Sequence, residues 1–215
     1  MTFSIVARTE DGLGVATATR SLAVGSIVPA VAPGVGAVAT QARTNRAFRA
    51  RGLQLMGAGT DPEDVLTALA DEDPGFAERQ VALVDAAGRS AVWTGRQCLP
   101  WAGGWARPGL ALAGNILVGR EVLEAMDAAY EAAPHEALGR RLLSALQAGD
   151  RAGGDRRGRQ SAAVVVMPLE GPAEWPPRAR VDLRVDDHAD PVAELVRLLD
   201  LHESDHLDRA PVASP

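Results

Sequence analysis

The sequence predicts an α+β fold of four layers, in which two β-sheets lie face to face and helices cover both outer faces. The expected elements run in the order strands, two helices, strands, two helices, strands. Hydrophobic residues make up 47% of the 215 positions, which is enough for a sizeable core. Paired helices between blocks of antiparallel strands favour this αββα sandwich, although the same order also fits other α+β domains.

The chain shows no internal repeat and no linker that would divide it. We therefore expect one domain over residues 1–200. The remaining residues, 201–215, are expected to form a frayed C-terminal tail, because chain ends without buried contacts are poorly ordered.

The N-terminal quarter alternates in a way that is typical of strands. Turn residues at Glu10–Gly12 and Pro33–Gly34 separate the runs and favour hairpins. The strands predicted here are residues 3–8, 13–19, 26–31 and 35–40. Two helices should follow, one over residues 45–56 and one capped by Asp61, with Pro62 in its first turn.

The second half repeats this order. Its elements are identified by apolar spacing of two for strands and of three to four for helices. The expected strands are residues 80–85, 89–94, 101–105, 110–113, 161–167 and 181–185, and the expected helices are residues 119–132, 134–148 and 191–199.

Composition excludes several classes of function. The formal charge is −6, from 28 acidic and 22 basic residues, which argues against a general nucleic-acid or membrane-surface binder. All basic residues are arginine, so a mechanism that needs a lysine is excluded. Cys98 is the single cysteine, so no disulfide framework or thiolate metal cluster is expected. No apolar run is long enough for a membrane span, and we expect a cytoplasmic protein without metal or cofactor.

The second residue carries the most suggestive chemistry. Thr2 stands behind Met1 and opens the first predicted strand. Aminopeptidases normally remove a methionine that precedes so small a residue, which would give Thr2 a free α-amine. The hydroxyl nucleophile and its general base would then belong to one residue. The alternative is an N-terminal threonine without any catalytic use.

Longer segments carry a family resemblance. Residues 2–7 with Gly14–Arg20 resemble the start of N-terminal nucleophile (Ntn) hydrolases such as proteasome β-subunits. The similarity is closer to an uncharacterised Ntn-hydrolase-like bacterial family, a domain of unknown function. Its recurring segments stand here at residues 2–7, 38–42, 113–115, 153–163 and 182–188. The resemblance spans about residues 1–200 and implies an αββα sandwich of Ntn type, whereas a fold does not by itself fix a reaction.

The resemblance also implies where partners of Thr2 should lie. Gln41 ends a strand expected beside the first one, and Asn115 follows Gly114 in a segment that such folds turn toward the nucleophile. Both amides suit the stabilisation of an oxyanion. The alternatives are a strand-end residue that caps a helix for Gln41 and a turn residue for Asn115. Asn45 is either a helix N-cap or a substrate-facing amide.

The loop over residues 153–161 is the second strong signal. Asp155 is expected to orient the Thr2 amine, while Arg157 or Arg159 is expected to bind a substrate carboxylate in bidentate fashion. Arg20, Gln160 and Ser161 complete the predicted substrate-binding set. The lysine beside the nucleophile of proteasome β-subunits has no counterpart here. Arg20 is the cation at the end of the second strand, but a guanidinium cannot accept a proton. A solvated hairpin and a structural arginine are the alternatives.

Together these residues suggest an amidohydrolase that cleaves a C–N bond in a small, carboxylate-bearing metabolite through an acyl-threonine. We expect a homo-oligomer, specifically a dimer, packed through its outer helices. A second hypothesis is a non-catalytic ligand-binding or assembly protein on the same scaffold. A third is a metal-dependent hydrolase built on Asp186, Asp187 and His188. The alternative for these three residues is a simple turn before the last helix.

Overall fold

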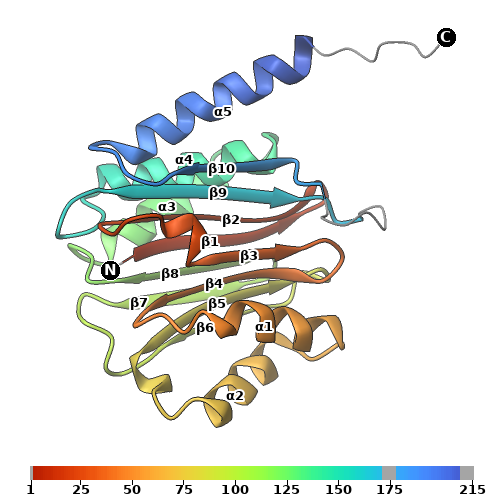
Figure 1. Ribbon diagram of the computed structural model, residues 1–215, viewed down its shortest axis with the longest axis vertical. Coiled ribbons are helices and arrows are strands. Elements are labelled where there is room, and N and C mark those ends of the chain that lie inside the picture. Colours follow the sequence, from red (N-terminus) through yellow and green to blue (C-terminus); the bar gives the residue numbers. More distant parts are fainter. Residues whose placement is uncertain (1, 171–177, 209–215) are drawn as a thin grey trace.

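A computed structural model describes residues 2–170 and 178–208 (Figure 1). Its strands are β1 (Thr2–Thr9), β2 (Gly12–Thr19), β3 (Pro29–Ala32), β4 (Gly36–Ala42), β5 (Arg79–Asp85), β6 (Ser90–Thr94), β7 (Gly103–Arg107), β8 (Leu110–Asn115), β9 (Ser161–Met167) and β10 (Val181–Val185). Its helices are α1 (Ala47–Gly57), α2 (Pro62–Glu72), α3 (Glu121–Glu131), α4 (Leu138–Arg151) and α5 (Pro191–Asp208), with 3₁₀ turns η1 (Val24–Ser26) and η2 (Phe76–Glu78).

The strands form two antiparallel sheets. One has the order β10-β9-β2-β1-β8-β7 and the other the order β3-β4-β5-β6. β1 is a central strand, with Phe3 opposite Ala18 of β2 and Thr2 opposite Asn115 of β8. The start of the chain therefore has hydrogen-bonded neighbours on both sides.

Helices cover both outer faces. On the six-stranded sheet, Phe3, Ile5 and Leu112 pack in one cluster with apolar residues of α3, α4 and α5. On the four-stranded sheet, Val38 and Leu83 pack against α1 and α2 in another. Figure 1 shows α1 and α2 on the side opposite to α3, α4 and α5. The four-layer αββα sandwich predicted from the sequence is confirmed.

The space between the sheets is filled by a third cluster, made largely of alanine and valine. It follows from alternation, since successive residues of a strand point to opposite faces. The cluster consists of Val6, Leu13, Val15, Val24, Val28, Ala37, Ala39, Ala82, Val84, Ala111, Ala113 and Ala163.

Some boundaries differ from the prediction. Residues 24–26 form the 3₁₀ turn η1, and β3 begins only at Pro29, instead of a strand over residues 26–31. The helix expected from residue 134 begins at Leu138. Apart from the end of α5, the structure places the other strands and helices within a few residues of the expected ranges.

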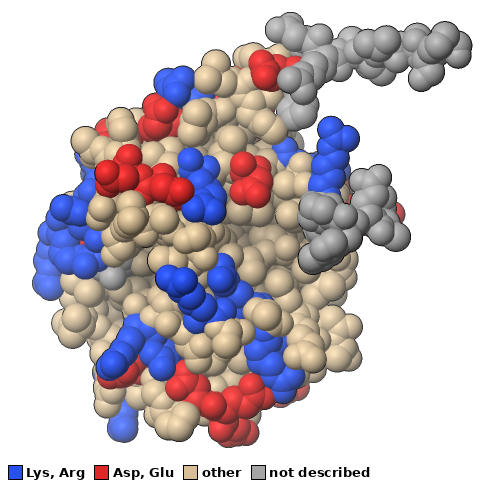
Figure 2. Space-filling view, in the orientation of Figure 1, with Lys and Arg blue, Asp and Glu red and all other residues tan. Residues whose placement is uncertain are grey.

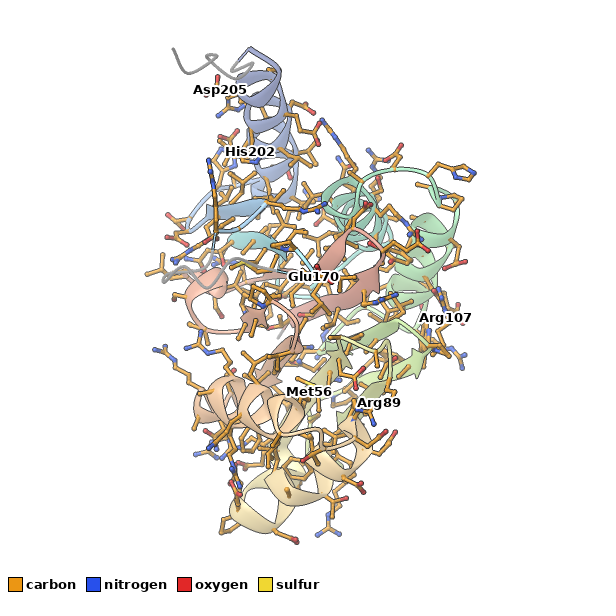
Figure 3. All side chains as sticks on the ribbon, turned by 90° about the vertical axis from the view of Figure 1, so that its right-hand side faces the viewer. Met56, Arg89, Arg107, Glu170, His202 and Asp205 are labelled. Carbon is orange, nitrogen blue, oxygen red and sulfur yellow. The ribbon has the colours of Figure 1, made fainter. Side chains whose placement is uncertain are left out.

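The last helix continues past the point where we expected a frayed tail. α5 reaches Asp208, because its second half has partners. Glu203 accepts from Arg140 Nε of α4 at 3.0 Å, and His202 Nε2 lies 2.8 Å from the carbonyl oxygen of Arg180. Figure 3 shows His202 and Asp205 on this helix. The tail predicted beyond residue 208 lies outside the described residues.

Two surface properties bear on function. On the face shown in Figure 2, arginine side chains form small groups interrupted by carboxylates and uncharged residues. Among the helices of residues 2–170 and 178–208, none combines the length and the hydropathy needed to cross a membrane.

Candidate functional site

Polar side chains gather at one end of the space between the sheets, where the alanine and valine cluster stops. We call them the polar layer. Alternation brings them there, because each lies an even number of residues from an inward-facing apolar residue of its own strand. The polar layer consists of Thr2, Ser4, Thr17, Thr19, Gln41, Gln80, Thr94, Asn115 and Ser161.

Thr2 lies at the outer edge of this layer and is 6% exposed. Its Oγ1 donates to Oγ1 of Thr19 on β2 at 3.2 Å. One step deeper, Ser4 Oγ lies 2.6 Å from Oε1 of Gln41 and 2.8 Å from Oγ1 of Thr17. An amide oxygen only accepts, so the Ser4 hydroxyl donates to Gln41 and accepts from Thr17. Two hydroxyl pairs thus link the central strands β1 and β2.

Two buried amides hold the carbonyl oxygen of Thr2, and a third, Gln80, joins them. Gln41 Nε2 donates to the carbonyl oxygen of Thr2 at 3.2 Å and to Oε1 of Gln80 at 2.7 Å. Asn115 Nδ2 donates to the same Gln80 oxygen at 2.9 Å and lies 3.5 Å from the Thr2 carbonyl oxygen. Both N–H groups of Gln41 are thereby engaged with the protein, not directed at a substrate oxyanion.

Gln80 is the centre of this network, and sequence reasoning missed it. Its Nε2 lies 2.8 Å from the carbonyl oxygen of Gly114, 3.0 Å from that of Gly103 and 2.9 Å from Oγ1 of Thr94. The side chain is fully buried. The alternation of the strand could have identified Gln80 as an inward-facing polar residue, since a strand over residues 80–85 puts it on the same face as Ala82 and Val84. A polar residue on an inward apolar face needs a partner.

Asp155 is bound to the backbone of Arg20, the residue that follows Thr19 at the end of β2. Its carboxylate is buried and accepts from the Arg20 backbone N–H at 2.8 Å and from the Arg157 backbone N–H at 2.7 Å. The Arg157 guanidinium lies 3.3 Å away. The loop is tied to the site by Gln160, whose N–H donates to the carbonyl oxygen of Thr19 at 3.0 Å.

The other predicted loop residues bind parts of the protein. Arg20 Nη1 donates to Oε1 of Gln160 at 2.6 Å. Ser161 Oγ donates to the carbonyl oxygen of Ser21 at 2.6 Å and accepts from the Val24 N–H at 3.0 Å, so it holds the turn after β2. Arg159 Nε donates to Asp150 at 2.7 Å, on the α4 side of the loop.

Asn45 lies apart from Thr2, at the start of α1. Its Oδ1 accepts from the Ala47 N–H at 3.1 Å, and its Nδ2 donates to Asp73 at 2.9 Å. The N-cap position of α1 is Arg46, and Asn45 stands one residue before it, so these are contacts of the turn that leads into the helix. Arg79 Nε also donates to Asp73, at 2.9 Å.

Asp73 should make stability sensitive to acid. The Arg79 hydrogen bond, followed by those from Asn45 and the Gly75 N–H, lowers the pKa of Asp73 to about 2 against the opposing effect of burial. Since a folded-state pKa below the unfolded value of about 4 stabilises only the ionised form, this contribution is present above pH 4 and is lost as pH falls toward 2. We expect Asp73→Asn to lower the free energy of unfolding at neutral pH by about 2 kcal/mol.

Urea denaturation of both proteins between pH 2 and 7 measures this difference. It should shrink as the solution is acidified. Asp71→Asn, an exposed change two residues earlier, is the matched control. A difference that is constant with pH would contradict the assignment.

A pocket of about 350 Å³ opens beside the polar layer. Asn115 belongs to both. Ala42 and Ile116, which follow Gln41 and Asn115, line the pocket and have positive φ angles of 68° and 49°. Such angles are unfavourable for a β-branched residue, and they gather at functional sites more often than elsewhere. The lining residues are Ala42, Arg43, Glu78, Gln97, Cys98, Leu99, Asn115 and Ile116.

The Asp186–His188 segment shows turn contacts. Asp186 pairs with Arg184 at 2.9 Å, Asp187 accepts from Gln160 at 3.0 Å, and His188 Nδ1 accepts from the Asp190 N–H at 3.0 Å. Among the residues that the structure describes, no group of three or more His, Cys, Asp or Glu side chains is placed to hold a metal ion.

Comparisons with known proteins identify relatives. Protein SPO2555 from Silicibacter pomeroyi is 34% identical, with a TM-score of 0.83, and the match covers 93% of this chain and 85% of that one. Weaker similarity links the protein to Anbu from Yersinia bercovieri (11% identity, TM-score 0.40, 99% and 100% coverage). Similarity of the same order links it to BPH from Thiobacillus denitrificans, solved in complex with epoxomicin (14% identity, TM-score 0.43, 79% of this chain and 100% of that one). No curated protein matches.

The family model described as "Family of unknown function (DUF1028)" matches residues 2–195, and SPO2555 carries the same family name. The resemblance to an uncharacterised family, a domain of unknown function, is confirmed, and so is the fold class, a four-layer αββα sandwich. The chain therefore belongs to the DUF1028 family.

Proposed function

We propose that the protein is an amidohydrolase in which Thr2, freed of Met1, is the nucleophile. The observation that carries the proposal is the position of Thr2. It opens the central strand β1, its hydroxyl lies in a buried polar layer, and its cross-strand neighbour Asn115 lines a pocket of about 350 Å³. An Ntn-type sandwich is a suitable scaffold for such a hydrolase.

The reaction assigned to this geometry has two steps. The Thr2 amine takes the hydroxyl proton while Oγ1 attacks the amide carbon, and the C–N bond then breaks as the leaving nitrogen receives that proton. Water attacks the resulting acyl ester, giving the carboxylic acid and free Thr2. In this scheme Thr19 orients the hydroxyl and Asp155 orients the amine. Asn115 holds the Thr2 carbonyl oxygen at the pocket wall, because its amide N–H groups contact that oxygen and Oε1 of Gln80.

Gln41 and Gln80 are proposed as positioning residues. The Gln41 amide holds the carbonyl oxygen of Thr2, and the Gln80 amide holds the amide of Gln41, which sets the direction in which Thr2 enters β1. This revises the role expected for Gln41 from the sequence, because its two N–H groups are already engaged. Arg157 and Arg159 are assigned to holding the loop, since their guanidinium groups bind Asp155 and Asp150.

An intact-mass measurement tests the proposal directly. We expect the purified protein to be lighter than its full sequence by one methionine residue and to gain one adduct from an electrophilic β-lactone. Thr2→Ala should lose the same methionine and gain no adduct. A protein that keeps Met1, or an adduct unchanged in Thr2→Ala, would contradict the mechanism.

One observation favours the alternative, a non-catalytic ligand-binding protein: the engagement of Gln41 with Thr2 instead of an open donor site. That alternative predicts ligand binding at the pocket with no covalent adduct. A homo-oligomer formed through the outer helices stays a prediction from the sequence.

A further inference from the structure

The pocket contains an ion pair at its rim that the sequence did not point to. Nη1 of Arg43 lies 3.1 Å from both carboxylate oxygens of Glu78. The pair continues the β4–β5 ladder, because Gln41 pairs with Gln80 and the Arg43 N–H donates to the carbonyl oxygen of Glu78 at 3.3 Å. Two residues along the backbone therefore separate the Cα atoms of the pair from those of Gln41 and Gln80, roughly 7 Å at the rise of a strand.

The pair is accessible to a ligand. The Arg43 side chain is 75% exposed and that of Glu78 33%. Solvated ion pairs of this kind contribute little stability, so exchanging one for contacts with a ligand costs little. A ligand with only a carboxylate would place it beside Glu78, and one with only an ammonium would place it beside Arg43. A ligand that carries both charges satisfies both residues.

We propose that this pocket binds the α-amino-acid end of a small molecule, with its carboxylate on Arg43 and its ammonium on Glu78. The pocket lining also includes the apolar residues Ala42, Leu99 and Ile116. They suit a short run of methylene groups. The pocket volume of about 350 Å³ fits a metabolite of amino-acid size and not a folded protein segment.

The spacing then selects the substrate class, and this step rests on the proposed function. With the charged end on the pair, two methylene groups carry the terminal amide of the ligand toward Asn115 and Thr2. The substrates are ω-amides of acidic amino acids, above all γ-glutamyl amides. Attack by Thr2 Oγ1 breaks the C–N bond of that terminal amide, releases an amine and, after water attacks the ester, releases glutamate. The carboxylate preference expected from the sequence is thereby assigned to Arg43.

Calorimetric titration of the full-length Thr2→Ala variant tests binding without turnover. The probes are L-glutamine, glutaramic acid, which lacks the ammonium, and γ-aminobutyramide, which lacks the carboxylate. We expect glutamine to bind about tenfold or more tightly than either analogue. Equal affinities for the three, or no detectable binding of glutamine, would overturn the inference.

Variants of the pair locate the binding site. In the same Thr2→Ala background, Arg43→Gln and Glu78→Gln should each weaken glutamine binding by about tenfold. Arg51→Gln is the matched control, because it breaks an exposed ion pair with Glu72 between α1 and α2. Unchanged affinity in both pocket variants would refute the assignment.

The two proposals fail in different ways. Selective glutamine binding without hydrolysis of any γ-glutamyl amide by the wild-type protein would remove the proposed reaction and leave the binding site. Hydrolysis of amides that carry no α-amino-acid end, with normal trapping of Thr2, would remove only the substrate class.

Discussion

Replacing Thr2 with alanine is expected to reduce amide hydrolysis by on the order of 10³-fold or more, because the variant lacks the attacking oxygen. The fold should survive. Among the described residues, the Thr2 side chain bonds to Thr19, and the side chains that hold its carbonyl oxygen are those of Gln41 and Asn115. Steady-state release of glutamate from a γ-glutamyl amide measures the first effect, and thermal unfolding measures the second.

Thr2→Ser is the matched control for this loss. Serine keeps a hydroxyl on the same carbon and the same free amine after methionine removal, so part of the activity should remain. If Thr2→Ala retained activity within about tenfold of wild type, the acyl-threonine route would be excluded, since a lost nucleophile costs far more.

The largest loss of stability outside the apolar core is expected from Gln80→Leu. Leucine would leave the N–H groups of Gln41 and Asn115 without their acceptor, in a region where water does not reach. Because each buried unsatisfied polar group costs about 1–3 kcal/mol, we expect the free energy of unfolding to fall by about 3 kcal/mol. The Thr2 carbonyl would also lose its fixed position, so the rate of β-lactone labelling should fall.

Urea denaturation measures this effect, and Gln54→Leu, an exposed change on α1, is the control. Gln80→Glu adds a readout that a simple packing role would not give. An ionised carboxylate would face the carbonyl oxygens of Gly103 and Gly114, so the folded protein would hold the proton more tightly than the unfolded state does. That variant should lose stability as pH rises. A Gln80→Leu protein as stable as wild type would contradict the network.

Much of the fold was accessible from the sequence because it rests on local patterns. Alternation identified the strands, and Asp61 with Pro62 marked the start of α2, where the Asp61 side chain accepts from the Glu63 N–H. The start of β3 and the length of α5 were not accessible. The first depends on a 3₁₀ turn held by Ser161, and the second on Glu203 meeting Arg140, contacts between distant parts of the sequence.

Part of the candidate site was also predictable, because short segments of the sequence resemble those of a family. Segments of family resemblance pointed to Thr2, Asn115 and Asp155, which the structure brings to one end of the sandwich. Gln80 and the Arg43–Glu78 pair were missed because they acquire meaning only through the register of β4 against β5. A sequence read alone does not say which amide faces which. The direction of each hydrogen bond, and hence the engaged state of Gln41, depends on that pairing.

The alanines between the sheets have a consequence for mutational tolerance. Small side chains on β4, β5, β8 and β9 let the two sheets approach closely, and that separation sets how far Gln41 reaches to the carbonyl of Thr2. Enlarging Ala39 or Ala113 would push the sheets apart, because interiors are packed too tightly to absorb added methyl groups. In a saturation mutagenesis screen for activity, Ala39 and Ala113 should therefore tolerate as few substitutions as the residues of the polar layer.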